Sequence, residues 1–326
     1  MSRYRHDLNA TATFGYKRMV DGAGAESAKS ATAQQALEKA QLNWKVEKRA
    51  LYLKNKKAIP SHMAVVRTDT GEPLGVVGNR YQPVQNKEAF AFFDKVVGEG
   101  RAIYTSAGYT GGGKRIWISA KLPGEMRIKG TEDVTRKYLL LVNSHDATGA
   151  VKILYTPLRI ACYNMLDYAM REGEQRISIR HTGSISYKIS EAQRALGLAV
   201  RFFDEFADLA NHLAKVSVKD KAVKRFIESL YPKSDDETKE RKNERIRDIV
   251  FRRYSKGRAN QLKGIRGTAW AAYNAVAEHV DHGRRVRGTD DEDRTRNRFA
   301  SAAFGFGAML KRQALSLAQE VLVKAS

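Results

Sequence analysis

The sequence predicts an α+β fold: an antiparallel β-sheet of hairpins with a packed helix, followed by a helical C-terminal half. Alternating apolar and polar stretches, separated by turn residues, fill residues 63–186, and this pattern is typical of hairpin strands. Beyond residue 189, apolar residues recur every three or four positions, as on one face of a helix. We therefore expect a disordered or flexible basic arm, a strand-rich α+β core domain and a helical domain, over residues 1–41, 42–188 and 189–326.

The arm is expected to lack a core of its own. Residues 21–35 are small and polar and bury too little to become ordered, and a short helix is expected only from Ala36. Apolar and charged residues begin to alternate over residues 43–53. Residues 54–60, "KNKKAIP", are expected to form a basic connector.

Three hairpins are expected in the core domain. The first spans residues 63–79 around a Thr-Gly turn, the second flanks "TGGGK" at 110–114, and the third flanks "HDATG" at 145–149. Pro157 is expected to open a helix after the third hairpin, since its missing N–H is harmless there. A further strand within residues 175–186 should close the sheet.

Helices account for the remaining elements. One follows the first hairpin, with Asn86 as its N-cap and Phe90, Phe93 and Val97 on its buried face. The C-terminal half should hold helices over residues 190–213, 219–230, 236–254, 267–282 and 294–323, the last with an apolar stripe that includes Phe299, Phe306 and Leu310.

The charge balance limits the possible partners. The 326-residue chain has 58 Lys and Arg against 36 Asp and Glu, a net charge of +22 that attracts polyanions, of which nucleic acid is the commonest in the cytoplasm. No run of about eighteen apolar residues predicts a membrane span, and the N-terminus lacks a signal-peptide core. A single cysteine, Cys162, excludes an internal disulfide and a thiolate-rich zinc site. We therefore expect a cytoplasmic protein.

The segment "GYTGGGKR" at 108–115 matches a phosphate-binding P-loop except at its last position, where Arg115 replaces Ser or Thr. A P-loop opens a helix, whereas the residues that follow alternate as a strand. We therefore expect a hairpin tip whose two cations, Lys114 and Arg115, contact a phosphate backbone, and no nucleotide cofactor.

The stretch "NSHDATG" admits two interpretations. His145 and Asp146 could be a general base and its orienting group, with Cys162 as nucleophile, which would indicate a nuclease-like enzyme. In the alternative, Asp146 caps backbone amides of a tight turn, Gly149 supplies a positive φ, and Cys162 lies in the core. We favour the turn.

The segment "HVDH" places His279 and His282 at a spacing that can share a metal ion, with Asp281 between them. No third ligand is evident in the sequence. We therefore expect no metal here and place both histidines at the solvated end of a helix.

Aromatic residues interleave with cations in the strand region, as in proteins that stack bases and hold phosphates of single strands. Trp117 is either buried or such a stacking platform, and the pattern leaves both open. A second basic stripe steps along one helix face near residues 241–256. The expected nucleic-acid contacts are Arg80, Tyr81, Tyr109, Lys114, Arg115, Lys152, Tyr155, Arg159, Arg241, Arg245 and Arg252.

Four separated motifs, within residues 75–86, 139–166, 267–282 and 304–315, resemble the family of phage- and plasmid-like proteins catalogued as a domain of unknown function. The resemblance implies a protein of a mobile element and marks polar motif residues: Asn79, Arg80, Tyr81, Asn143, His145, Asp146, Arg159, Cys162 and Asn164. The strand order is also similar to that of single-strand annealing proteins, which assemble into rings and hold DNA in a groove.

These observations favour a single-stranded DNA-binding, annealing protein that acts in recombination without nucleotide hydrolysis. The expected partners are single-stranded DNA or RNA and further copies of the chain, without a membrane. Two alternatives remain open: a nucleic-acid-modifying enzyme that uses His145, Asp146 and Cys162, and an anti-defence phage protein that binds a host protein.

Overall fold

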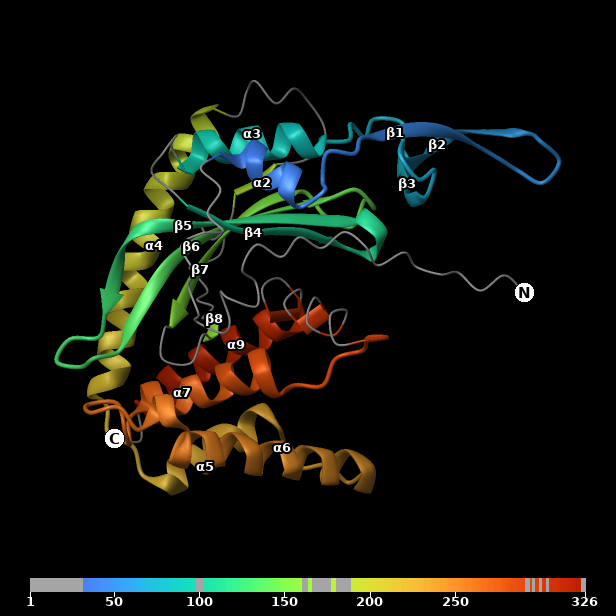
Figure 1. The fold of residues 1–326 in the computed structure, drawn as a ribbon. Helices are drawn as coiled ribbons and strands as arrows, with labels where there is room; N and C mark the ends of the chain where they lie inside the picture. Colours follow the sequence, from blue (N-terminus) through green and yellow to red (C-terminus); the bar gives the residue numbers. More distant parts are fainter. Residues whose placement is uncertain are drawn as a thin grey trace. The chain divides into compact units, whose positions relative to one another are not determined.

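The computed structural model describes residues 32–97, 103–159, 164–165, 177–179, 189–290, 294, 297–298, 301–302 and 305–323. Antiparallel sheets occupy the N-terminal half and helices the C-terminal half, so the predicted α+β class is confirmed (Figure 1). Within these residues, no helix combines the length and apolar character needed to cross a bilayer.

The chain divides into two compact units that interleave along the sequence. Unit 1 draws on residues 1–123, 138–155 and 171–200, and unit 2 on residues 124–137, 156–170 and 201–326. The predicted segments divided the chain at residues 41 and 188 instead. Strands β5 and β6 and helix α4 each begin in one unit and continue into the other.

The first sheet of unit 1 has the order β1-β2-β3, with β1 at Val46–Tyr52, β2 at Ala58–Arg67 and β3 at Pro73–Gly78. The hairpin predicted around Thr70-Gly71 is confirmed as β2–β3, and Gly71 has the positive φ, 74°, that the turn needs. The prediction that residues 54–60 form a connector between elements is partly wrong. Residues 58–60 belong to β2, and β1 and β2 form a further hairpin around residues 53–57.

Helix α2 (Ala33–Lys39) lies inside the segment predicted as a flexible arm. Thr32 caps the helix through a hydrogen bond from the Gln35 amide, and Ala33, Ala36 and Leu37 are buried. The Asp94 carboxylate of α3 (Asn86–Val97) accepts the Ala33 amide at 3.1 Å, which fixes the two helices side by side (Figure 1).

Helix α3 begins where predicted, and Phe90 and Phe93 are buried as expected. The role assigned to Asn86 is wrong, however. Its amide nitrogen donates to the Leu42 carbonyl at 2.9 Å and its oxygen faces His145, so its side chain is not the cap. Glu88 accepts the Gln85 amide at 3.0 Å instead.

The second sheet contains the other two predicted hairpins. Its order is β4-β5-β6-β7-β8, with β9 also paired to β7. The strands are β4 (Ile103–Thr110), β5 (Arg115–Arg127), β6 (Val134–Ser144), β7 (Val151–Arg159), β8 (Asn164–Met165) and β9 (Ile177–Ile179). The strand expected within 175–186 is therefore present as β9.

The helix expected from Pro157 is absent there, because Pro157 is a buried residue of β7. Among the described residues, β9 pairs with Val151–Ile153 and β8 with Leu158–Arg159, so Pro157 falls between the two paired segments.

Trp117 of β5 is buried, so it is a core residue and not an exposed stacking platform. Its ring lies against Gly108 of β4, where a Cβ would come within 2.7 Å of the indole. Only glycine fits opposite this ring. Packing against Trp117 therefore explains Gly108, the first residue of "GYTG".

Helices form most of unit 2. They are α4 (Ile189–Lys215), α5 (Asp220–Leu230), α6 (Glu237–Lys256), α7 (Ala269–Glu278) and α9 (Phe306–Leu317), with π-helical turns at His279–Gly283 and Ala318–Leu322. The first four agree closely with the predicted helices.

The single helix predicted over 294–323 is wrong. Gly305 has an extended backbone conformation, and α9 starts only after it. Phe306, a member of the predicted apolar stripe, is exposed beneath the Arg284 guanidinium, whereas Leu310 is buried. Phe299 lies outside the described residues.

The core of unit 2 includes strand residues as well as helices. The buried Trp270 of α7 donates its indole N–H to the buried Asp133 carboxylate at 2.9 Å. The Lys129 amide donates to Asn211 of α4 at 2.7 Å. The hairpin 124–137 therefore belongs physically with the helices.

Candidate nucleic-acid interface

Two hairpin turns of unit 1 interlock at one end of the second sheet. The His145 amide of the β6–β7 turn donates to the Lys114 carbonyl of the β4–β5 turn at 2.8 Å. The Arg115 guanidinium donates to the Thr148 hydroxyl at 3.3 Å. Both turns are therefore held against each other by backbone and side-chain bonds.

The β4–β5 turn is a tight glycine turn and not a P-loop. Gly111, Gly112 and Gly113 have φ values of 61°, 69° and 108°, a run that other residues adopt only with strain. It joins two strands, as predicted, and does not open a helix. Arg67 fixes the turn by donating to the Gly112 carbonyl at 3.0 Å.

Arg67 is itself held in a cage of aromatic and acidic side chains. Its guanidinium lies 4.3 Å from the centroid of the Trp44 ring and 5.5 Å from that of Tyr109, and it pairs with Asp69 at 2.6 Å. Tyr109 therefore already packs on Trp44 and Arg67, and its half-buried ring can offer a base only part of its surface.

Asp146 organises the β6–β7 turn, as the structural interpretation predicted. Its Oδ1 accepts the Thr148 amide at 3.0 Å and the hydroxyls of Ser144 and Thr148, both at 2.5 Å. The positive φ of the turn, 65°, falls on Ala147, so its assignment to Gly149 is wrong. On the other side, Gly75 of β3 packs on the Asp146 backbone, where a Cβ would lie only 2.7 Å from its Cα.

His145 lies in the interior and not at the hairpin surface. Its side chain is 0% exposed, and Nε2 lies 2.8 Å from the Asn86 oxygen, to which it donates. The Asp146 carboxylate bonds within its own turn, and Cys162 lies outside the described residues. The geometry therefore gives no support to a catalytic pair of His145 and Asp146.

Replacing Asp146 with asparagine should lower the free energy of unfolding by about 1 kcal/mol at neutral pH, because charge-assisted bonds to the turn are lost. Burial raises the pKa of this carboxyl, but the bonds from Ser144 and Thr148 and the charge of Arg115 outweigh burial and hold the pKa below its usual value. A lowered pKa stabilises the fold above the unfolded pKa, and this gain is lost as the pH falls through the folded pKa. Urea unfolding of Asp146→Asn and wild type should therefore differ at pH 7 and converge in acid. An exposed control, Glu72→Gln, should show no such difference.

Three cations surround the β6–β7 turn, and we call Lys114, Arg115 and Lys152 the turn cluster. Lys114 is exposed, and Arg115 and Lys152 are half-buried. The Lys152 ammonium lies 3.8 Å from the position that a Cβ would take at Gly149. Asp146 offsets one of the three charges, so the turn keeps a positive surplus on a fixed backbone.

The other predicted contacts in this region have different environments. Tyr155 is only 5% exposed, so its assignment as a base-stacking ring is wrong. Tyr81 donates its hydroxyl to the Ser144 carbonyl at 3.0 Å and braces the turn, while Arg80 is exposed. Arg159 of β7 and Asn164 of β8 are partners in the strand pairing. The structure describes the backbone of these two residues and not their side chains.

Two of the motif asparagines form hydrogen bonds that tie strands to neighbouring segments. The buried Asn143 donates to the Val84 carbonyl at 3.0 Å and ties β6 to the loop before α3. Asn79 donates to the Pro60 carbonyl, and its own carbonyl accepts the Lys48 ammonium at 2.9 Å. Asn79 thus ties the end of β3 to the hairpin β1–β2.

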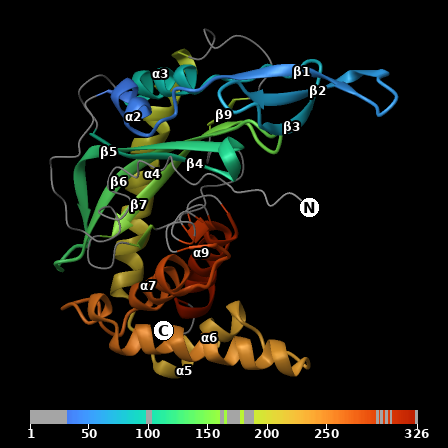
Figure 2. The same cartoon turned by 45° about the vertical axis from the view of Figure 1, so that its right-hand side comes forward.

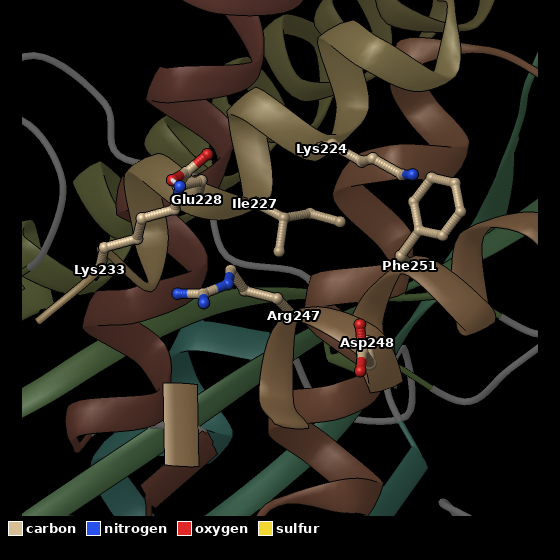
Figure 3. Close-up of a pocket in the computed structure, with 7 residues that line it drawn as sticks. All are labelled: Lys224, Ile227, Glu228, Lys233, Arg247, Asp248 and Phe251. Carbon is tan, nitrogen blue, oxygen red and sulfur yellow. Dashed lines mark ion pairs between the residues drawn. The ribbon is translucent and has the colours of Figure 1, made fainter. Parts of the chain in front are cut away.

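In unit 2, the predicted basic stripe lies on α6. Arg241, Arg245 and Arg252 are exposed, and Arg241 pairs with Glu237 at 3.1 Å. Beside the stripe, a hollow of about 290 Å³ opens between α5 and α6 (Figure 3). Its lining has a net positive charge and consists of Lys224, Ile227, Glu228, Lys233, Arg247, Asp248 and Phe251.

The "HVDH" segment is not the solvated helix end that was predicted. His279 and Asp281 are buried in a π-helical turn, and Asp281 pairs with the Lys311 ammonium at 2.8 Å. Burial, together with the charges of Arg253 and Arg284, lowers the pKa of His279 to about 4. Across the described part of the chain, no group of three potential metal ligands occurs.

Sequence reasoning missed two features of unit 1. Arg67 and Trp44 support the glycine turn from distant positions, and no local pattern links them. The lysines of "KNKK" form the tip of the β1–β2 hairpin, a position that their run of charge between two alternating stretches could have indicated.

The fold and the interlocked turns define an α+β protein with a braced cationic hairpin end. Its sequence matches the family described as "Domain of unknown function (DUF932)" over residues 73–302, which is more than half of its 326 residues. The chain therefore belongs to this family. No curated protein and no solved structure matches it.

Proposed function

We propose that this protein binds single-stranded nucleic acid, DNA in the first place, through the turn cluster of unit 1 and without consuming a nucleotide. The observation that carries the proposal is the convergence of Lys114, Arg115 and Lys152 on one braced turn. Cations on a fixed backbone lose no backbone freedom on binding, so the remaining ordering cost is that of their side chains.

The wider charge distribution supports the same partner. The net charge of +22 favours association with any polyanion, and the exposed arginines of α6 add a second basic surface on unit 2. The motif resemblance to phage and plasmid proteins favours a protein of a mobile element. The strand order, similar to that of single-strand annealing proteins, favours strand annealing in recombination within the host cytoplasm. Annealing requires only charge neutralisation and an extended strand, for which no catalytic group is needed.

Self-association is part of the proposal. Phe306 and Met309 of α9 are exposed large apolar side chains, and such residues are common at contacts between copies. Gel filtration with and without a short oligonucleotide measures both oligomer size and association with the strand.

We expect the purified protein to bind a fluorescein-labelled oligothymidylate, measured by fluorescence anisotropy. Affinity should fall steeply between about 50 and 200 mM salt, because phosphate contacts release counterions. An unlabelled strand should compete, and complementary strands should anneal faster with the protein than without it. Absence of any binding at low salt would refute the proposal, and binding that ignores salt would point to a different kind of partner.

A further inference from the structure

The β1–β2 hairpin extends beyond the sheet to which it belongs. Among the described residues, β3 pairs with β2 only from His62 to Val66. Beyond a bulge after Ala50, β1 and β2 pair with each other at Leu51–Ile59 and Tyr52–Ala58, so the segment 51–61 projects as a hairpin past the described part of the three-stranded sheet (Figures 1 and 2). We call Leu51–Ser61 the ribbon. Asn79 anchors its base through the Pro60 carbonyl.

The tip of the ribbon is an ordered turn. The Leu53 amide donates to the Lys57 carbonyl, and the Lys56 amide donates to the Leu53 carbonyl, both at 2.8 Å. The Asn55 side chain accepts the Lys57 amide at 3.1 Å. The turn requires a left-handed residue, and Lys56 takes that position with a φ of 64°.

Lysine is an unfavourable choice at this position. Glycine adopts the left-handed conformation without strain, and asparagine is enriched there, so Lys56 takes this conformation at a local conformational cost. A strained residue at an exposed tip suggests a role for its side chain.

The chemistry of the ribbon suits a nucleic-acid strand. Tyr52 is 64% exposed and Leu53 50%, and the residue paired with Tyr52 across the ribbon is the small Ala58, which leaves the ring uncovered. Lys54, Lys56 and Lys57 are all exposed, and residues 51–63 contain no Asp or Glu.

We propose that the ribbon is a second nucleic-acid contact, in which a base stacks on Tyr52 while the three tip lysines hold the flanking phosphates. This inference rests on the proposed function and adds a site that the turn cluster does not include. An aromatic ring beside cations is the combination that single-strand binders use. Strand pairing with a second copy is disfavoured, because charged residues such as Lys48 and Arg49 lie on β1, whose outer edge pairs with no other described strand.

Lys56→Gly separates binding from folding. Glycine fits the left-handed turn better than lysine, so the thermal midpoint should equal or exceed that of the wild type. The affinity for oligothymidylate should nevertheless fall, and the slope of log affinity against log salt should drop by about 0.7. Lys56→Arg, which keeps the charge, is the matched control and should retain binding.

Tyr52 tests the stacking contact. Tyr52→Ala should weaken binding about tenfold with an unchanged salt slope, whereas Tyr52→Phe, which keeps the ring, should bind like the wild type. Tyr52→Leu should behave as Tyr52→Ala, because an apolar side chain without a ring cannot stack. Equal binding by all three variants would overturn the stacking contact.

The outcomes distinguish this inference from the proposed function. If the wild type binds no oligonucleotide, the proposed function fails. If the wild type binds and both Lys56→Gly and Tyr52→Ala bind equally well, only the ribbon site fails. If the ribbon variants lose binding to lipid vesicles but not to oligonucleotides, the ribbon recognises a membrane surface and the proposal is wrong.

Discussion

Replacing Lys311 with methionine should lower the free energy of unfolding by about 3–5 kcal/mol, the largest stability effect that we expect in unit 2. The Lys311 side chain is 0% exposed and that of Asp281 is 3% exposed, and their charged atoms lie 2.8 Å apart. Removal of the ammonium would leave the Asp281 carboxylate buried next to an apolar side chain. The cost arises from burying this charge without its ammonium more than from the lost attraction.

A double variant measures that cause directly. Lys311→Met combined with Asp281→Leu removes both charges and should recover much of the lost stability, since an apolar pair of similar volume often replaces a buried ion pair without loss. Lys221→Met, at an exposed site on α5, should change stability little. Urea unfolding followed by tryptophan fluorescence provides the measurement. A loss from Lys311→Met no greater than that from Lys221→Met would contradict the expectation.

Replacing Lys114 and Arg115 together with alanine should weaken the binding of single-stranded DNA roughly tenfold at low salt and lower the salt slope by about 1.4. Lys114 is exposed beside the turn, and Arg115 lies against Thr148 of the neighbouring turn, so both charges sit at one place. Loss of both removes two of the three cations of the turn cluster. Anisotropy titrations at several salt concentrations measure the affinity and the slope together.

The matched control removes the same charge elsewhere. Lys87→Ala with Lys129→Ala takes two exposed lysines from outside the turn cluster and should lower affinity far less. Because Arg115 also bonds to Thr148, Lys114→Gln alone serves as a variant that leaves this bond intact and should still lower the slope by about 0.7. Equal losses from the cluster variant and from the control would show that only total charge matters.

The three predicted hairpins and most predicted helices are present because both kinds of element depend on local patterns. A Thr-Gly turn between alternating stretches specifies β2–β3 without distant contacts. The helix from Pro157 was wrong because proline suits a helix start by propensity, while strand pairing on either side decided the outcome. The long terminal helix was wrong because an extended Gly305 interrupts an otherwise continuous stripe.

The site was less predictable, since its geometry depends on residues far apart in the sequence. The capping role of Asp146 follows from its own turn and was predicted correctly. The burial of His145 depends on Asn86, which is 59 residues away, and the glycine turn depends on Arg67. The ribbon was missed for a different reason. Its tip lacks the glycine or asparagine that turn patterns favour at a left-handed position, and only its run of charge between two alternating stretches could have indicated it.

Unit 2 is built from three separate segments of the chain, and this limits which fragments can fold and which gene segments can be exchanged. Asp133, which accepts the Trp270 indole, precedes α4 in the chain, so a fragment that begins at residue 189 would leave that indole without its acceptor. Recombination between genes that exchanged the C-terminal half alone would separate the same pair. We therefore expect this family to diverge as whole genes, and not by shuffling its helical half as an independent cassette.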